Sequence, residues 1–196
     1  MKRSTKTVRI KTIFLMIILI AAPTLAIITG TGTDAAALRC VLDQEMWAVG
    51  GSDGFGGATI LGQTFVPSAP GHVCKVVVRI QKNNPLAGAL TLRIRRHDKT
   101  PLPGGTITIP AAAIPMGLSV QSFNFACVPL LAGSPFYGLT LEAPTSPPAA
   151  YRWFNSAGAG GAGAYPAGHG WFSLNGGAFW MLRPYDYAFR VYQCRP

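Results

Sequence analysis

Acidic residues are scarce in this chain. Only 7 of its 196 residues are Asp or Glu, against 17 Lys and Arg. Glycoside hydrolysis needs two carboxyl groups about 5 to 9.5 Å apart in one cleft, and only Asp43, Glu45 and Asp53 cluster in the sequence. We therefore expect no catalytic residues and no enzyme. The same three side chains are weak candidates for calcium, which takes several oxygen ligands, and the alternative is a solvated acidic loop.

Close pairs of metal-binding or catalytic side chains are also missing. The histidines His72, His97 and His169 lie far apart, and only His97 has an adjacent carboxylate, Asp98, in what we interpret as a solvated turn. The four cysteines include no close pair of the kind that binds zinc. We expect neither a metal cluster nor a cofactor.

Helices are missing after the glycine-rich motifs that would need them. Gly158, Gly160 and Gly163 match the G-x-G-x-x-G spacing, but residues 165–168 (YPAG) cannot begin a helix that holds pyrophosphate. Residues 50–54 (GGSDG) match G-x-S-x-G, again without the helix that a nucleophile elbow requires. We interpret the first motif as a flexible loop and the second as a turn.

The chain begins with a cationic and then an apolar segment. Five basic residues precede the uncharged apolar run 13–28, and small residues follow up to Ala37. This order is typical of an export signal. We expect cleavage after Ala37, which leaves a signal peptide (1–37) and a single domain (38–196). Because the uncharged stretch is about as long as the ~20 residues that span a bilayer, a retained N-terminal anchor helix is the alternative.

Export places the domain outside the cytoplasm, as a secreted or cell-surface protein. Membrane contact is then expected only through an uncleaved N-terminal segment. The domain keeps 12 basic and 6 acidic residues. Its basic residues are scattered, so we expect no nucleic acid as a partner.

Four cysteines in an exported chain predict two disulfides, because thiols are not kept reduced outside the cytoplasm. Four cysteines can form two disulfides in three ways, and the sequence permits all three. Cys40 and Cys194 lie near the two ends of the domain, while Cys74 opens one apolar strand and Cys127 closes another, as adjacent antiparallel strands would require. We predict the pairs Cys40 with Cys194 and Cys74 with Cys127.

Short strands dominate the domain. Apolar and polar side chains alternate with a period of two within 89–96, which indicates one buried face. No segment of the domain shows a long helical period, and the 16 prolines and 23 glycines of the chain break most attempts at one. The pattern predicts an all-β fold, a two-sheet antiparallel sandwich. The expected strands are 73–81, 89–96, 106–110, 120–129, 136–142, 151–155, 170–174 and 185–193.

Six strand signatures follow one another between residues 60 and 193. They are 63–65 (QTF), 76–80 (VVVRI), 88–94 (GALTLRI), 123–125 (FNF), 136–141 (FYGLTL) and 185–192 (YDYAFRVY). Their order resembles the jelly-roll modules of many bacterial exported proteins and is similar in layout to carbohydrate-binding and galactose-binding-like domains. The resemblance implies a jelly-roll sandwich. Members that bind sugars use exposed aromatics and polar side chains on one sheet face or on end loops, and some carry a structural calcium ion.

Aromatic residues gather in the last quarter of the chain. Twelve lie between Tyr151 and Tyr192, and among them Tyr165, Trp171 and Trp180 flank the glycine-rich stretch and an Asn-Gly-Gly turn. Sugar rings stack on flat aromatic faces, so these three are the candidate ligand-binding residues. The alternative is that they fill the core or cap its open end.

Three arginines form a candidate basic patch for acidic glycans. Arg93, Arg95 and Arg96 alternate in part with apolar residues, so they equally fit the solvated face of a half-buried strand. We expect an exported, non-catalytic module that binds carbohydrate or another surface ligand, with a glycan or a cell-surface protein as its partner. The alternatives are a structural assembly protein of the cell surface and, third, a secreted hydrolase.

Overall fold

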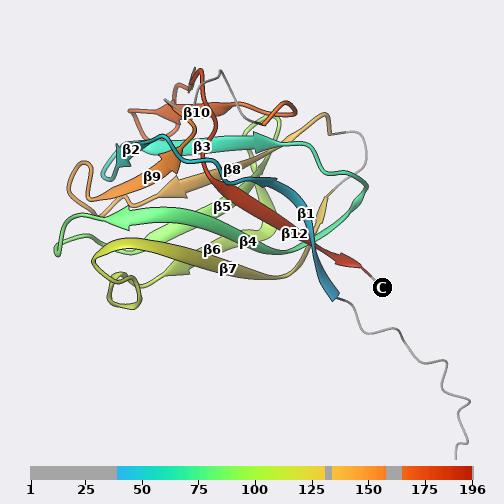
Figure 1. Ribbon diagram of the computed structural model, residues 1–196, viewed down its shortest axis with the longest axis horizontal. Coiled ribbons are helices and arrows are strands. Elements are labelled where there is room, and N and C mark those ends of the chain that lie inside the picture. Colours follow the sequence, from blue (N-terminus) through green and yellow to red (C-terminus); the bar gives the residue numbers. More distant parts are fainter. Residues whose placement is uncertain (1–38, 131–133, 158–164, 196) are drawn as a thin grey trace, which may run out of the picture. The chain divides into compact units, whose positions relative to one another are not determined.

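The computed structural model describes residues 39–130, 134–157 and 165–195, which form two antiparallel sheets of six strands each (Figure 1). The first sheet has the order β1-β12-β4-β9-β2, and β7 also pairs with β4. Its strands are β1 (Arg39–Met46), β2 (Gly51–Phe55), β4 (Gly71–Lys82), β7 (Gly117–Leu130), β9 (Tyr151–Asn155) and β12 (Phe189–Arg195). The all-β, two-sheet prediction is therefore confirmed.

The second sheet has the order β11-β10-β3-β8-β5-β6. A short 3-10 turn, η1 (Ala111–Ala113), lies between β6 and β7 in the chain. The strands of this sheet are β3 (Ile60–Phe65), β5 (Leu90–Arg96), β6 (Pro101–Ile109), β8 (Tyr137–Glu142), β10 (Gly170–Ser173) and β11 (Met181–Leu182). The predicted leader, its cleavage point and the glycine loop at 158–164 lie outside the described residues.

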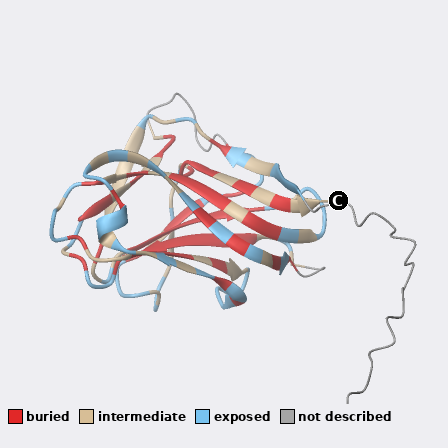
Figure 2. Ribbon diagram, turned by 90° about the horizontal axis from the view of Figure 1, so that it is seen from below, coloured by how far each residue is buried: buried red, intermediate tan, exposed pale blue. Residues whose placement is uncertain are grey.

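The core lies between the two sheets. Buried residues run along the strands, as Figure 2 shows in red: they alternate with less buried ones in β9 and β12, whereas every residue of β3 and β8 is buried. In β5 the side chains of Leu90, Leu92 and Ile94 are fully buried, as the period-two pattern predicts. The largest fully buried side chain is Trp153, whose Nε1 donates to the Ala188 carbonyl at 2.8 Å. No helix among these described segments is long and apolar enough to cross a membrane.

Two sequence predictions of secondary structure differ in an informative way from the structure. Residues 50–54 do not form only a turn, because Gly51–Phe55 is strand β2 and pairs with β9. Glycine is needed there because a Cβ on Gly54 would come 2.8 Å from the Ala149 Cβ. The last strand begins at Phe189 instead of Tyr185. Before it, the backbone bonds to the segment that follows β9: the Asp186 carbonyl accepts from the amide of Ser156 at 2.9 Å.

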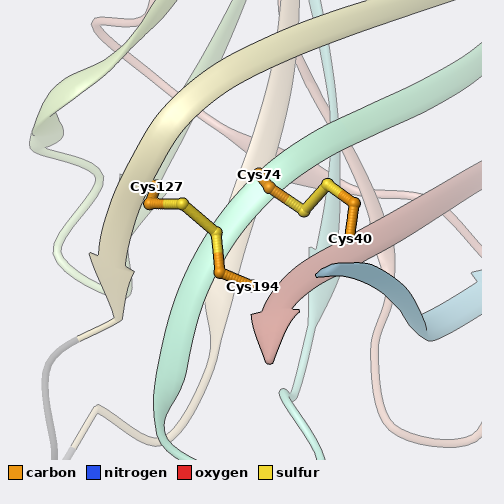
Figure 3. The surroundings of a disulfide bond; sticks show 4 residues. All are labelled: Cys40, Cys74, Cys127 and Cys194. Carbon is orange, nitrogen blue, oxygen red and sulfur yellow. A yellow bond between two sulfur atoms is a disulfide. The ribbon is translucent and has the colours of Figure 1, made fainter. Parts of the chain in front are cut away.

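The four cysteines form two disulfides, as predicted, but with other partners (Figure 3). Cys40 bonds to Cys74, with their Cα atoms 6.0 Å apart, and Cys127 bonds to Cys194, with Cα atoms 6.3 Å apart. The predicted pairs Cys40 with Cys194 and Cys74 with Cys127 are wrong. Two disulfides are consistent with an extracytoplasmic protein.

A β-bulge explains the difference. Strands β4 and β7 do pair antiparallel, but the register shifts so that residues 125–127 of β7 stand opposite Cys74 alone. Cys127 lies in this bulge with a φ of 51°, a left-handed conformation that redirects its side chain, and it bonds to Cys194 on β12. Cys40 stands opposite Cys194 in the β1–β12 ladder and yet bonds to Cys74.

Candidate functional site

The side chain of Trp171 lies on the outer face of the second sheet. In β3 the residues Leu61 and Phe65 belong to the core, so Gly62 between them faces outward. Trp171 stands opposite Gly62 in the β10–β3 ladder and is not part of the core cluster. A Cβ on Gly62 would overlap the indole Nε1, and one on Gly138 would come 2.6 Å from the indole Cζ2. The indole therefore rests on a floor of two glycines and is only 5% exposed.

Trp180 packs on Trp171 and completes what we call the indole pair. The ring centroids are 4.4 Å apart, and the planes are inclined by 32°. Trp180 is half-buried, so it is the more accessible of the two rings. The Asn175–Gly177 turn between β10 and β11 brings it back over the sheet, with φ values of 69° at Gly176 and 94° at Gly177 that favour glycine.

A cavity of about 200 Å³ opens beside the indole pair, and we call it the indole cavity. Its walls include His97, Lys99 and Phe136 together with the exposed side chain of Leu182. The His97 ring meets Phe136 edge-on, with centroids 6.3 Å apart, and its Nδ1 lies 3.4 Å from the Ser134 hydroxyl. The cavity thus combines aromatic walls with cationic or titratable side chains from the β5–β6 hairpin.

Lys99 reaches the indole pair because of the geometry of that hairpin. The Lys99 amide donates to the Arg96 carbonyl, and the Arg96 amide donates to the Thr100 carbonyl, both at 2.9 Å. This is a three-residue loop whose last position is left-handed, and Lys99 occupies it with a φ of 70°. Its Nζ lies 5.6 Å from the Trp171 ring centroid and 5.8 Å from that of Trp180. These are cation–π distances.

A polar network continues across the same sheet face from the indole pair. Arg93 Nε donates to one oxygen of Glu142 at 3.0 Å, and Arg95 Nη2 donates to the other at 2.6 Å. Arg95 Nε also donates to the Thr140 hydroxyl at 3.0 Å, and Arg95 Nη1 donates to the Lys99 carbonyl at 2.8 Å. Two guanidinium groups share one carboxylate, so the network has a surplus positive charge.

The structure brings two of the three predicted ligand residues together. Trp171 and Trp180 form the indole pair, whereas Tyr165 packs in the core, edge-on to Phe189 with centroids 5.2 Å apart. The Tyr165 hydroxyl donates to Gln44 at 2.8 Å, and burial raises the pKa of this phenol. Tyr165 lines a different cavity, of about 300 Å³.

The three calcium candidates are held apart by separate partners. Asp43 accepts from the Ser68 amide at 3.2 Å and pairs with Arg195 at 3.0 Å, while Glu45 pairs with Arg190 at 2.9 Å. In residues 39–130, 134–157 and 165–195, no three His, Cys, Asp or Glu side chains gather as metal ligands would.

Asp53, the third candidate, accepts hydrogen bonds from two tyrosines. The hydroxyls of Tyr185 and Tyr187 both donate to its Oδ2 at 2.6 Å, and Arg183 Nε lies 3.6 Å from the same oxygen. Burial, reinforced by the Asp53 carboxylate, raises the pKa of Tyr185 and Tyr187 well above the usual value. Both phenols therefore stay protonated as hydrogen-bond donors.

The basic patch has the strand geometry that the alternation suggests. Arg93 and Arg95 lie on the outer face and are part-buried by their contacts with Glu142. The sequence predicts a turn at His97, and in the structure Lys99 from this turn reaches the two tryptophans. Lys99 and Phe136 were not among the predicted site residues. The one available signal was a lysine at the end of a short hairpin loop, where Gly or Asn is usual.

Comparison of the chain with protein-family models and with curated protein sequences finds no match. The fold and the site together define a two-sheet antiparallel β-sandwich with two disulfides and a tryptophan pair on the outer face of one sheet.

Proposed function

We propose that this protein is an exported, non-catalytic module of jelly-roll type that binds carbohydrate through the indole pair. One observation carries the proposal: Trp180 is held partly exposed over a sheet face by stacking on Trp171, at 4.4 Å between centroids. The axial C–H groups of a sugar ring are apolar and stack on such a face. Two glycines keep the lower ring in place, so the stacking surface is preorganised.

The surroundings of the indole pair supply the polar groups that fix a sugar's orientation. The Lys99 ammonium and the His97 imidazole reach the indole cavity. The Arg95 guanidinium belongs to β5, the strand that leads into the same loop. The cavity is smaller than the ~300 to 1,000 Å³ of typical small-molecule pockets. It suits one sugar ring or the end of a chain rather than a long buried polymer.

The placement of the carboxylates supports binding without catalysis. Each of the six acidic residues of the domain contacts basic, hydroxyl, amide or backbone groups. They are Asp43, Glu45, Asp53, Asp98, Glu142 and Asp186. Glu142 is the one in the network beside the indole pair, and two arginines neutralise it. A glycoside hydrolase would need a second carboxyl group about 5 to 9.5 Å from the first in one cleft.

A glycan array tests the proposal. The oxidised protein is screened beside Trp180→Ala and a matched control, Phe179→Ala, which removes an aromatic of 62% exposure next to it in the chain. We expect specific binding by the wild type and the control, and its loss in Trp180→Ala. Folded protein that binds no glycan, or a Trp180→Ala variant that binds as the wild type does, would refute the proposal.

Strand β7 favours a second candidate, a structural role through self-association. In the described sheets β7 pairs with β4 alone, and over its 14 residues it exposes Leu118 and Val120 by 53% and 55%. A long apolar edge strand is a template for another strand, and a second copy of β7 offers the same apolar pattern. Sedimentation should then show a dimer that Val120→Lys dissociates. A monomer at all concentrations would exclude this role.

A further inference from the structure

We infer that the indole cavity prefers sugars that carry a carboxylate, which would pair with the Lys99 ammonium. The inference rests on the proposed carbohydrate-binding function and names the ligand class of the same site. It depends on three observations: an uncompensated lysine at the cavity wall, a backbone conformation that holds this lysine at a cost, and a surplus of positive charge around it.

Lys99 is the uncompensated charge. Among the ion pairs of the described residues, none includes Lys99, and its side chain is exposed. Its Nζ stays within 5.8 Å of both indole centroids. A carboxylate on a sugar stacked on Trp180 would find this ammonium within reach, and such charge-assisted hydrogen bonds are about twice as strong as neutral ones.

The backbone at Lys99 is strained for a lysine. A φ of 70° lies in the left-handed region, which is unfavourable for a residue with a Cβ atom. Asparagine and glycine occupy this hairpin position more easily. The lysine here is nevertheless anchored, because Arg95 Nη1 donates to its carbonyl at 2.8 Å. Strain of this kind gathers at binding sites, where the surrounding structure maintains it.

The charges around the cavity do not cancel. Three cationic side chains (Arg93, Arg95 and Lys99) stand against two carboxylates (Asp98 and Glu142) on the β5–β6 hairpin and on the outer face of β8. Glu142 is shared by two of the arginines. Asp98 accepts from the Thr100 hydroxyl at 2.6 Å and from its amide at 2.9 Å, and these bonds keep its pKa below the usual value. A neutral sugar leaves this excess positive charge without a partner, whereas an anionic sugar complements it.

The test compares acidic sugars with their uncharged methyl esters and with neutral sugars. Oligogalacturonate, oligoglucuronate and oligomannuronate are each titrated into the full-length oxidised protein as free acid and as methyl ester, with neutral hexose oligosaccharides alongside. We expect at least one free acid to bind about ten- to a hundredfold more tightly than its ester. Its affinity should fall several-fold as salt rises through the range in which the Debye length shortens to below about 8 Å.

Two substitutions at Lys99 make the test specific. Lys99→Asn removes the charge and fits the left-handed backbone, so the variant should melt no lower than the wild type. We expect it to lose most of the difference between acid and ester. Lys99→Arg keeps the charge and should keep that difference, and Phe179→Ala serves as the control outside the cavity.

The possible results distinguish a failure of this inference from a failure of the proposed carbohydrate binding. If esters or neutral sugars bind as well as the acids, or if Lys99→Asn keeps the full preference for the acid, the inference is wrong and carbohydrate binding stands. If folded protein binds neither acids, esters nor neutral sugars, the proposed function fails and the inference fails with it.

Discussion

The indole of Trp171 lies directly against the backbone of Gly62, its partner across the β10–β3 ladder. Glycine in the interior of a strand normally weakens it, and it often marks a place where another group approaches closely. Here that group is an indole on the outer face of the sheet. Trp180 then packs on this ring, so the absence of a side chain at Gly62 determines where the indole pair lies.

Gly62→Ala should displace the indole pair. The added Cβ overlaps the indole Nε1, so we expect the free energy of unfolding to fall by about 1 to 3 kcal/mol. Urea denaturation measures this loss. The cost should shrink in the Trp171→Ala background, because the clashing ring is gone. Equal costs in both backgrounds would mean that the two residues do not contact each other as described.

Removal of two different tryptophans should affect stability very differently. Trp153 is fully buried, stacks on Tyr187 with centroids 4.7 Å apart and donates a hydrogen bond. Its replacement by Ala should cost about 3 to 5 kcal/mol. Trp180→Ala should cost only about 1 kcal/mol, the value of an aromatic pair at a partly exposed site. Thermal and urea denaturation of both variants check this, and a Trp180→Ala variant that unfolds as readily as Trp153→Ala would place Trp180 in the core.

Tryptic peptide mapping under non-reducing conditions tests the disulfide pairing. No Lys or Arg lies between Cys40 and Lys75, so Cys40 and Cys74 share the peptide 40–75, while Cys127 lies in 100–152 and Cys194 in 191–196. We expect 40–75 to appear alone with an internal bond, and 100–152 to be joined to 191–196. A link from 40–75 to either other peptide would contradict this connectivity.

Alkaline pH should unfold the protein through Tyr187. Its pKa is raised in the folded state by burial first and by Asp53 second, while the unfolded chain ionises near the usual value of 10.0. The stabilisation is therefore complete below pH 10 and is lost as the pH rises further, by up to about 1.4 kcal/mol per pH unit for one group. Urea denaturation from pH 8 to 11.5 should show a shallower decline for Tyr187→Phe. Identical slopes would mean that this phenol titrates normally.

Sequence patterns predicted strands with a clear run of apolar or aromatic residues and missed strands without one. The segment 151–155 was predicted with its observed bounds because it is a short aromatic run between turn residues, and the structure buries three of its side chains at alternate positions. Strand β2 carries two glycines in five residues, which locally favour a turn, and it exists because β9 pairs with it. Such tertiary pairing cannot be inferred from local preference.

The residues of the candidate site were predicted only in part, for a related reason. Trp171 and Trp180 were found because aromatics near a glycine turn stand out in the sequence. Lys99 was missed because its position beside the indole pair depends on the hairpin between β5 and β6 and on a left-handed φ. The disulfide partners depend in the same way on a bulge opposite Cys74. Each of these features is set by register, which a composition pattern does not specify.

The most direct test is to follow the indole N–H signals of the protein by NMR while the glycan that binds best on the array is added. The Trp153 N–H is hydrogen-bonded to Ala188 in the core, whereas the indole pair forms a wall of the cavity. We predict that the signals of Trp171 and Trp180 shift on saturation and that the signal of Trp153 does not. Shifts confined to other residues, with both indoles of the pair unmoved, would contradict the assignment of this surface as the carbohydrate site.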